Sequence, residues 1–188
     1  MKVIFMKQTI HEELEIATGT TVKLESGIFT VKGPKGEAGK LLYNPKITFT
    51  IANNTIVFEA KKGTQREKRL IKAYIAHLKS MMKGVNENHT YKLRICSGHF
   101  PMTVTVKGNV FEIKNFSGET VPRHMKILED VKVTVDGHFI IVESVNKENA
   151  GQTAASIEKL TRRAAFDKRV FQDGIFIIEK DGKPVIKA

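Results

Sequence analysis

The sequence predicts an α+β protein built from two tandem, similar domains, each a mainly antiparallel sheet packed against one long helix. Three observations support this fold class. A segment of the chain recurs 82 positions later, apolar and polar residues alternate through both copies, and each half closes with a helical pattern. Strands followed by one helix, without strict strand–helix alternation, favour an antiparallel sheet covered on one face. We therefore expect an N-terminal α+β domain over residues 1–84 and a C-terminal α+β domain over residues 85–188.

The repeat lies at residues 22–37 (VKLESGIFTVKGPKGE) and residues 104–119 (VTVKGNVFEIKNFSGE). Aligned without a gap, five positions carry the same amino acid in both copies: Val22 and Val104, Phe29 and Phe111, Lys32 and Lys114, Gly36 and Gly118, and Glu37 and Glu119. In each copy a Ser-Gly or Gly-Asn pair separates two alternating segments, which is typical of a tight β-hairpin with one buried face.

A second hairpin is predicted in each half. In the first half it joins residues 46–49 to residues 56–59, and in the second half it joins residues 132–135 to residues 140–143. Asn-Asn and Asp-Gly pairs between these segments suit short turns. A last strand over residues 174–179 is expected to complete the second domain.

One helix is predicted to close each half. Apolar residues recur at three- and four-residue spacing over about residues 64–83 and again over about residues 152–165, the period of an amphipathic helix. A single β-barrel decorated by helices is the alternative architecture. It explains the hairpins, but it does not explain why helices recur at matching positions.

The composition indicates a folded protein that binds polyanions. The formal net charge is +11 and the sequence pI is about 9.7, and such basic domains typically contact nucleic acid. Residues 61–83 alone carry eight Lys or Arg against one acid, Glu67. No apolar run reaches the ~20 residues of a membrane span, and a single cysteine, Cys96, agrees with a reducing compartment. We therefore expect a cytoplasmic protein without a membrane partner.

The second predicted helix carries the most compact cationic cluster. Lys159, Arg162 and Arg163 stand at i, i+3 and i+4, so they are expected to share one helix face, and Lys168 and Arg169 follow. Arginine can hold a phosphate through two hydrogen bonds and can stack on an unpaired base. The cluster follows small residues around Gly151 and Gln152, and helix N-termini favour anions. A solvated helix face is the alternative interpretation of such charges.

A further candidate is the turn Lys32-Gly33-Pro34-Lys35-Gly36. It places two lysines on an exposed loop whose glycines permit close approach of the backbone to a partner. An ordinary turn is the alternative interpretation.

Motifs for catalysis, cofactors or metals are not assembled by this sequence. Residues 33–40 (GPKGEAGK) resemble a nucleotide-binding loop but have five residues between the glycines where four are required, and Leu41 stands where a hydroxyl is needed. Cys96 and His99 form an isolated C-x-x-H fragment without a second half. No acid–base pair is placed with a nucleophile. We expect a protein that is not an enzyme and has no cofactor or metal.

Five motifs in order identify a resemblance. They are residues 31–36 (VKGPKG), 82–85 (MKGV), 99–102 (HFPM), 151–157 (GQTAASI) and 170–175 (VFQDGI). Together they resemble the universal large-subunit ribosomal protein six family, in its archaeal and eukaryotic branch, over nearly the whole chain.

The resemblance implies two duplicated domains and a structural role in the large ribosomal subunit, in the cytoplasm. It implies large-subunit rRNA binding chiefly through the C-terminal domain, near the sarcin-ricin loop and the region where translation factors dock. Neighbouring ribosomal proteins are implied as partners, and translation factors as transient neighbours. Together with the charge pattern, it yields these RNA-binding candidates: Lys32, Lys35, Ser97, His99, Gly151, Gln152, Lys159, Arg162, Arg163, Lys168 and Arg169.

The distribution of charge between the two halves opposes the expectation that rRNA binds chiefly through the C-terminal domain. Residues 1–84 carry a net charge of +8, and residues 85–188 carry +3. We favour the C-terminal domain as the main RNA anchor because contact depends on local clustering, and salt screens charges more than ~8 Å apart. A non-ribosomal basic interaction module and a nucleic-acid hydrolase are the alternative functions.

Overall fold

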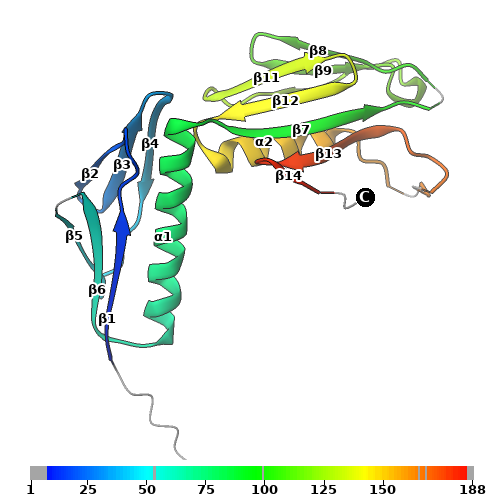
Figure 1. Ribbon diagram of the computed structural model, residues 1–188. Coiled ribbons are helices and arrows are strands. Elements are labelled where there is room, and N and C mark those ends of the chain that lie inside the picture. Colours follow the sequence, from blue (N-terminus) through cyan, green and yellow to red (C-terminus); the bar gives the residue numbers. More distant parts are fainter. Residues whose placement is uncertain (1–7, 53, 99, 165, 168, 186–188) are drawn as a thin grey trace, which may run out of the picture. The chain divides into compact units, whose positions relative to one another are not determined.

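The computed structural model describes residues 8–52, 54–98, 100–164, 166–167 and 169–185. The chain divides into two compact units, one ending at Glu87 and the other beginning at Asn88. Each unit combines antiparallel sheets with one long helix (Figure 1), so the predicted fold class is confirmed. The described strands form four separate sheets rather than one continuous barrel.

The N-terminal unit has two three-stranded sheets, ordered β2-β3-β4 and β1-β6-β5, and the helix α1. Its elements are β1 (Gln8–Glu15), β2 (Thr21–Glu25), β3 (Ile28–Gly33), β4 (Gly36–Leu41), β5 (Thr48–Ala52), β6 (Thr55–Gly63) and α1 (Gln65–Asn86). The helix packs on strands of both sheets (Figure 1).

The C-terminal unit has a three-stranded sheet ordered β10-β9-β8, a five-stranded sheet ordered β11-β12-β7-β13-β14, and the helix α2. Its strands are β7 (His89–Cys96), β8 (Thr103–Lys107), β9 (Val110–Lys114), β10 (Arg123–Lys126), β11 (Val131–Asp136), β12 (Phe139–Ser144), β13 (Gly174–Lys180) and β14 (Lys183–Pro184). A short 3₁₀ turn spans Phe116–Gly118, and α2 spans Lys147–Leu160. The helix packs on β7, β12 and β13 (Figure 1).

The two units repeat one topology. The order β1-β6-β5 in the first corresponds to β7-β12-β11 in the second, and β2-β3-β4 corresponds to β8-β9-β10. Phe29 and Phe111, which the repeat aligns, are both completely buried, and so is Val31, while its counterpart Ile113 is 1% exposed. The repeated sequence pattern therefore marks the same core positions in each unit. The last strand of the second unit, β13, is found where the sequence predicted it.

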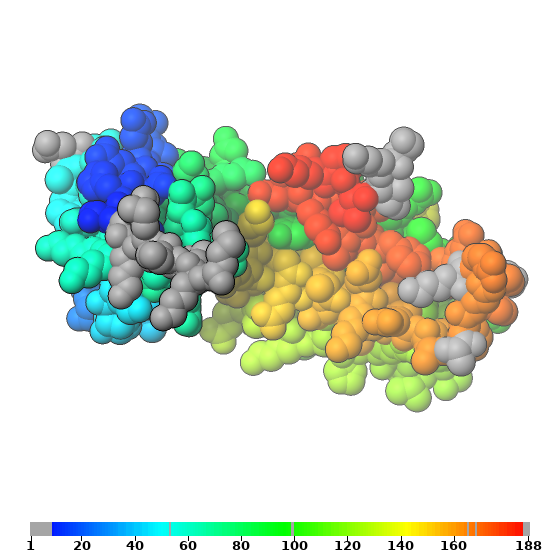
Figure 2. All heavy atoms as spheres, turned by 90° about the horizontal axis from the view of Figure 1, so that it is seen from below, coloured from blue at the N-terminus to red at the C-terminus, as the bar shows by residue number. Residues whose placement is uncertain are grey.

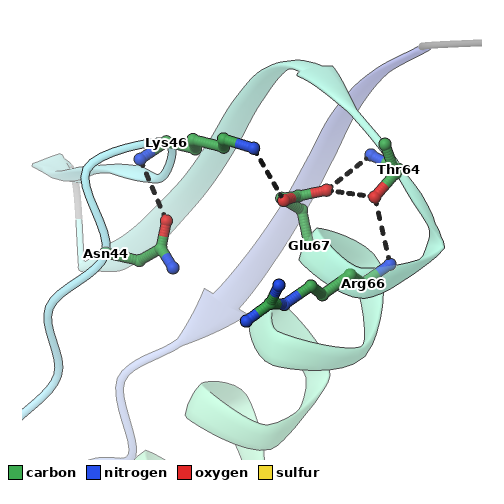
Figure 3. Close-up of polar contacts among 5 residues, drawn as sticks. All are labelled: Asn44, Lys46, Thr64, Arg66 and Glu67. Atoms are coloured by element: carbon green, nitrogen blue, oxygen red, sulfur yellow. Dashed lines mark hydrogen bonds and ion pairs between the residues drawn. The ribbon is translucent and has the colours of Figure 1, made fainter.

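The helix α1 begins at a capping box (Figure 3). The backbone N–H of Thr64 donates to Glu67 Oε2 at 2.8 Å, and the Thr64 hydroxyl donates to the same oxygen. Thr64 Oγ1 in turn accepts the N–H of Arg66 at 3.3 Å. These bonds satisfy donors that the first turn of a helix leaves unpaired. They lower the pKa of Glu67 from its ordinary 4.5 to about 2, chiefly through the hydroxyl of Thr64 and then its N–H.

The predicted boundaries of the second helix are wrong at both ends. The sequence pattern placed it at residues 152–165, whereas α2 spans Lys147–Leu160. It begins earlier because the Asn146 side chain caps it, accepting the N–H of Glu148 at 2.9 Å. Strands β1, β4, β7, β10 and β14 were not predicted. In β1 (QTIHEELE) only two residues are apolar, which gives little pattern to detect.

Candidate nucleic-acid interface

The C-terminal end of α2 is held against the sheet by one buried threonine. Thr161 caps the helix, and its hydroxyl donates to the carbonyl of Glu158 at 3.0 Å. The same oxygen accepts the backbone N–H of Ile175 in β13, also at 3.0 Å. Arg162 and Arg163 therefore lie in the loop that follows the helix. The prediction that they share a helix face with Lys159 is wrong.

These three cations nevertheless meet around one cavity. The cavity has a volume of about 450 Å³ and is formed by the end of α2, the loop after it and the 3₁₀ turn. Figure 2 shows the end of α2 (gold) and this loop (orange) together on one face of the C-terminal unit. The lining residues are Phe116, Ser117, Ala155, Glu158, Lys159, Thr161, Arg162, Arg163, Phe166, Phe171, Asp173 and Phe176.

Arg163 is fixed in place by two contacts. Its guanidinium carbon lies 4.1 Å from the centre of the Phe166 ring, and its Nη1 donates to the hydroxyl of Ser117. Phe166 also meets Phe171 edge to face, with ring centres 5.3 Å apart. A cation over an aromatic face is attracted by the ring quadrupole. The loop after α2 is therefore organised around an arginine and two aromatic rings.

Lys159 and Arg162 carry charges that the described residues do not neutralise. Both side chains are exposed, and within the described part of the chain neither has an ion-pair or hydrogen-bond partner. The two carboxylates of the cavity are held by backbone groups instead. Glu158 accepts the N–H of Ile177 at 3.1 Å, and Asp173 accepts the N–H of Gly98. The two cations at the rim are thus available to an anionic partner.

Arg123 supports this end of the helix, a role that the sequence analysis did not predict. Its Nη1 donates to the carbonyl of Leu160 at 2.6 Å, while Nε and Nη2 donate to the two oxygens of Glu119 at 2.7 and 2.6 Å. Its guanidinium carbon also lies 4.5 Å from the centre of the Phe116 ring. A cation is favourable at a helix C-terminus. The hydrogen bonds from Arg123 also lower the pKa of Glu119. No cluster or motif surrounds Arg123 in the sequence, so only the folded chain reveals its role.

Ser97 lies in the loop after β7, next to the loop after α2. The two loops are joined where Asp173 accepts the N–H of Gly98. A second cavity, of about 610 Å³, is lined by Ser97, Gly98, Gln172 and Asp173 among others. The structure therefore brings Ser97 to the same part of the unit as the cationic cluster. The candidates His99 and Lys168 lie outside the described residues.

Arg169 forms an ion pair with a neighbouring carboxylate. It is exposed, and its Nη2 donates to Asp167 Oδ2 at 2.8 Å, with Nε near both carboxylate oxygens. This pairing lowers the pKa of Asp167 and raises that of Arg169. An incoming phosphate would have to compete with Asp167 for this guanidinium.

Gly151 and Gln152 lie in the second turn of α2, so the prediction that they form the helix start is wrong. A Cβ atom on Gly151 would come within 3.1 Å of the Tyr91 hydroxyl, so the glycine lets the helix pack closely on β7. Gln152 is exposed and precedes Lys159 by seven residues. Two helical turns separate residues at this spacing, so Gln152 lies on the same side of α2 as Lys159.

Lys32 and Lys35 belong to the N-terminal unit, where both are exposed. Lys32 Nζ pairs with Glu37 at 2.7 Å across β3 and β4. The turn that carries Lys35 is tied to α1, because the N–H of Lys35 donates to the carbonyl of Val85 at 2.9 Å. A Cβ atom on Gly33 would come within 2.8 Å of the same valine. The glycine in this turn therefore has a packing role.

Metal sites and membrane-spanning helices are both absent from the described residues. No group of three His, Cys, Asp or Glu side chains there could hold a metal ion. No helix in that part of the chain is long and apolar enough to cross a membrane.

The cluster at the end of α2 combines two properties. Exposed cations at its rim can neutralise phosphates, and exposed aromatic rings beside them can stack on bases. Both properties suit nucleic acid.

Comparison with known proteins gives an independent result. The family described as "Ribosomal protein L6" matches residues 16–88 and 100–174. The chain is 41% identical to "Large ribosomal subunit protein uL6" of Methanosarcina mazei, covering 93% of this chain and 99% of that protein. It is also 41% identical to the proteins of the same name in Saccharolobus solfataricus, covering 92% and 96%, and in Methanococcus vannielii, covering 93% and 96%.

Proposed function

The chain belongs to the ribosomal protein L6 family, and we propose that it is a structural constituent of the large ribosomal subunit that binds large-subunit rRNA through its C-terminal unit. Membership of a family of ribosomal proteins confirms the prediction that the chain is not an enzyme. It is located in the ribosome, in the cytoplasm.

The observation that carries the rRNA proposal is the cluster at the end of α2. Lys159 and Arg162 are exposed and unpaired among the described residues, and they line the same cavity as Arg163. Neutralising phosphates with such side chains releases condensed counterions, which drives binding to polyanions. The carboxylates of Glu158 and Asp173 on the cavity wall accept backbone N–H groups, and among the described residues neither forms an ion pair with Lys159 or Arg162.

The proposal extends to the position on the rRNA. The Ser97 loop and the loop after α2 form one surface, which we place near the sarcin-ricin loop and the region where translation factors dock. The family resemblance supports this position, and the joined loops supply a continuous surface for it. Neighbouring ribosomal proteins are permanent partners in this proposal, and translation factors are transient ones.

Sedimentation of a cell lysate tests the assignment to the large subunit. The tagged chain is expected to co-migrate with large subunits in a density gradient. Chemical footprinting of rRNA in the isolated subunits should then show protections in the sarcin-ricin region that vanish from subunits lacking the chain. A slowly sedimenting, small complex would instead favour a basic interaction module.

The salt dependence of rRNA affinity tests the cationic cluster. The double variant Lys159→Ala with Arg162→Ala should reduce the slope of log affinity against log salt by about two units, because each lost phosphate contact removes about one. The matched control is Lys126→Ala with Lys132→Ala, which removes the same charge from exposed positions of the same unit. Equal slopes for the two double variants would contradict the assignment.

A further inference from the structure

The cavity at the end of α2 has an unusual wall for a surface of this charge. Phe166 and Phe171 are 42% and 50% exposed, although they pack edge to face on each other. Exposed aromatic rings cost solvation free energy unless a partner covers them. Both rings line the cavity beside Lys159, Arg162 and Arg163.

The dimensions of the cavity suit one small planar group. Its volume of about 450 Å³ lies within the range of small-ligand pockets, ~300–1,000 Å³. The floor is firm, because Phe116 is 1% exposed and Thr161 joins α2 to β13. Ala155 lines the cavity with only a methyl group from the helix. The cavity therefore exists before any partner binds.

The charges around the cavity decide which planar group fits. An apolar side chain of a protein partner would cover the rings but would leave Lys159 and Arg162 without counter-charges. A nucleotide matches both the aromatic rings and the cations of the cavity, since its base has an aromatic face and its phosphates are anionic. Only an unpaired base exposes that face, because bases inside a duplex are stacked on their neighbours.

We propose that this cavity receives one unpaired base of the rRNA, which stacks on the ring of Phe171 while the flanking phosphates lie at Lys159 and Arg162. Phe166 packs edge to face against that ring and supports it. Arg163, held by Ser117 and by the Phe166 ring, borders the base and keeps the two rings in position. This assignment rests on the proposed rRNA binding and names the nucleotide class that the site selects.

The test compares two substitutions at one exposed position, with purified large-subunit rRNA as the probe. Phe171→Leu keeps apolar bulk but removes the ring, and Phe171→Tyr keeps the ring. The leucine variant should bind about five- to 150-fold more weakly, the range for loss of one base–aromatic stack. Its salt slope should equal that of the unmodified chain, because no phosphate contact is lost. The tyrosine variant should bind within about twofold of the unmodified chain.

Chemical probing of the bases supplies a second readout. One base should be protected in the complexes of the unmodified chain and Phe171→Tyr, and reactive in the complex of Phe171→Leu. Phe166→Leu should expose the same base. This second variant keeps the test decisive if Phe171→Leu proves less stable to heat than the unmodified chain.

The outcomes separate the two proposals. If Phe171→Leu binds as tightly as the unmodified chain, or if no base loses protection in its complex, the base-binding cavity is wrong while rRNA binding stands. A partner protein would then be the occupant of the cavity. If the unmodified chain itself fails to bind large-subunit rRNA, the proposed function is wrong and the cavity assignment falls with it.

Discussion

Single residues in this protein act through specific hydrogen bonds that sequence patterns do not always reveal. The Thr64–Glu67 capping box is legible in the sequence as T-x-x-E, and its bonds are present in the structure (Figure 3). Lys46 Nζ adds an ion pair to Glu67 Oε1 at 3.5 Å, but that lysine is 69% exposed, so solvent weakens the contribution. The threonine supplies the principal interaction of this carboxylate.

The capping box predicts a pH-dependent loss of stability. Because the pKa of Glu67 is lowered to about 2 in the folded protein, ionised Glu67 stabilises the fold above its ordinary pKa of 4.5, and this contribution is lost as the pH falls from 4.5 to 2. Thr64→Ala should lower the free energy of unfolding by about 1 kcal/mol at pH 7. The difference from the unmodified chain should narrow below pH 4.5, as measured by urea unfolding.

Thr50→Ala provides the control for this experiment. Thr50 is exposed in β5, and no side-chain hydrogen bond joins it to the described residues. Its effect on stability should not vary over the same pH range. A constant difference for Thr64→Ala would show that the cap does not hold the Glu67 carboxylate.

At the scale of elements, the position where α2 ends decides the geometry of the cluster. An extension of the helix would have placed Arg162 and Arg163 on a helix face, but Thr161 ends it and turns both into a loop. Arg123 reaches this end from β10 and holds the last carbonyl of the helix. A strand, a helix end and a 3₁₀ turn are thus joined by side chains rather than by backbone pairing.

Arg123→Met should destabilise this junction by about 2 kcal/mol. The substitution removes hydrogen bonds to a charged partner and leaves the half-buried Glu119 carboxylate without its cation. The pKa of Glu119 should return toward its ordinary value of 4.5, which a side-chain NMR titration would record. Lys126→Met on the same strand is the control, since the Lys126 side chain is exposed and forms no ion pair or hydrogen bond with the described residues. Equal stability of the two variants would contradict this role of Arg123.

In the molecule as a whole, the net charge favours the N-terminal unit as the main rRNA-binding unit, whereas the clustering of cations favours the C-terminal unit. Residues 1–84 carry +8 against +3 for residues 85–188. Much of the N-terminal excess lies along α1, where Arg66, Arg69, Lys72 and Lys79 are exposed. The C-terminal unit instead concentrates its cations beside a cavity with aromatic walls. The proposal depends on this arrangement rather than on the sum.

Two double variants of the full chain test whether rRNA binding depends on the net charge of a unit or on the local clustering of its cations. Lys72→Ala with Lys79→Ala should change the salt slope of rRNA binding by less than about half a unit, whereas Lys159→Ala with Arg162→Ala should change it by about two. The measurement is affinity for large-subunit rRNA over a series of salt concentrations. A larger change for the α1 variant would make the N-terminal unit the main anchor.

Local sequence patterns were sufficient to predict the duplicated α+β architecture, the hairpins around Phe29 and Phe111, the course of α1 and the cationic character of the segment after residue 158. These features follow from periodicity and turn residues that are close together in the chain, so a local pattern is sufficient to predict them. The end of α2, the packing role of Gly151 and the position of Arg123 were decided only by the tertiary structure. Arg123 and Leu160 are 37 residues apart, and Gly98 and Asp173 are 75 apart. No local pattern records such pairs, because they form only when the sheets and the helix have packed.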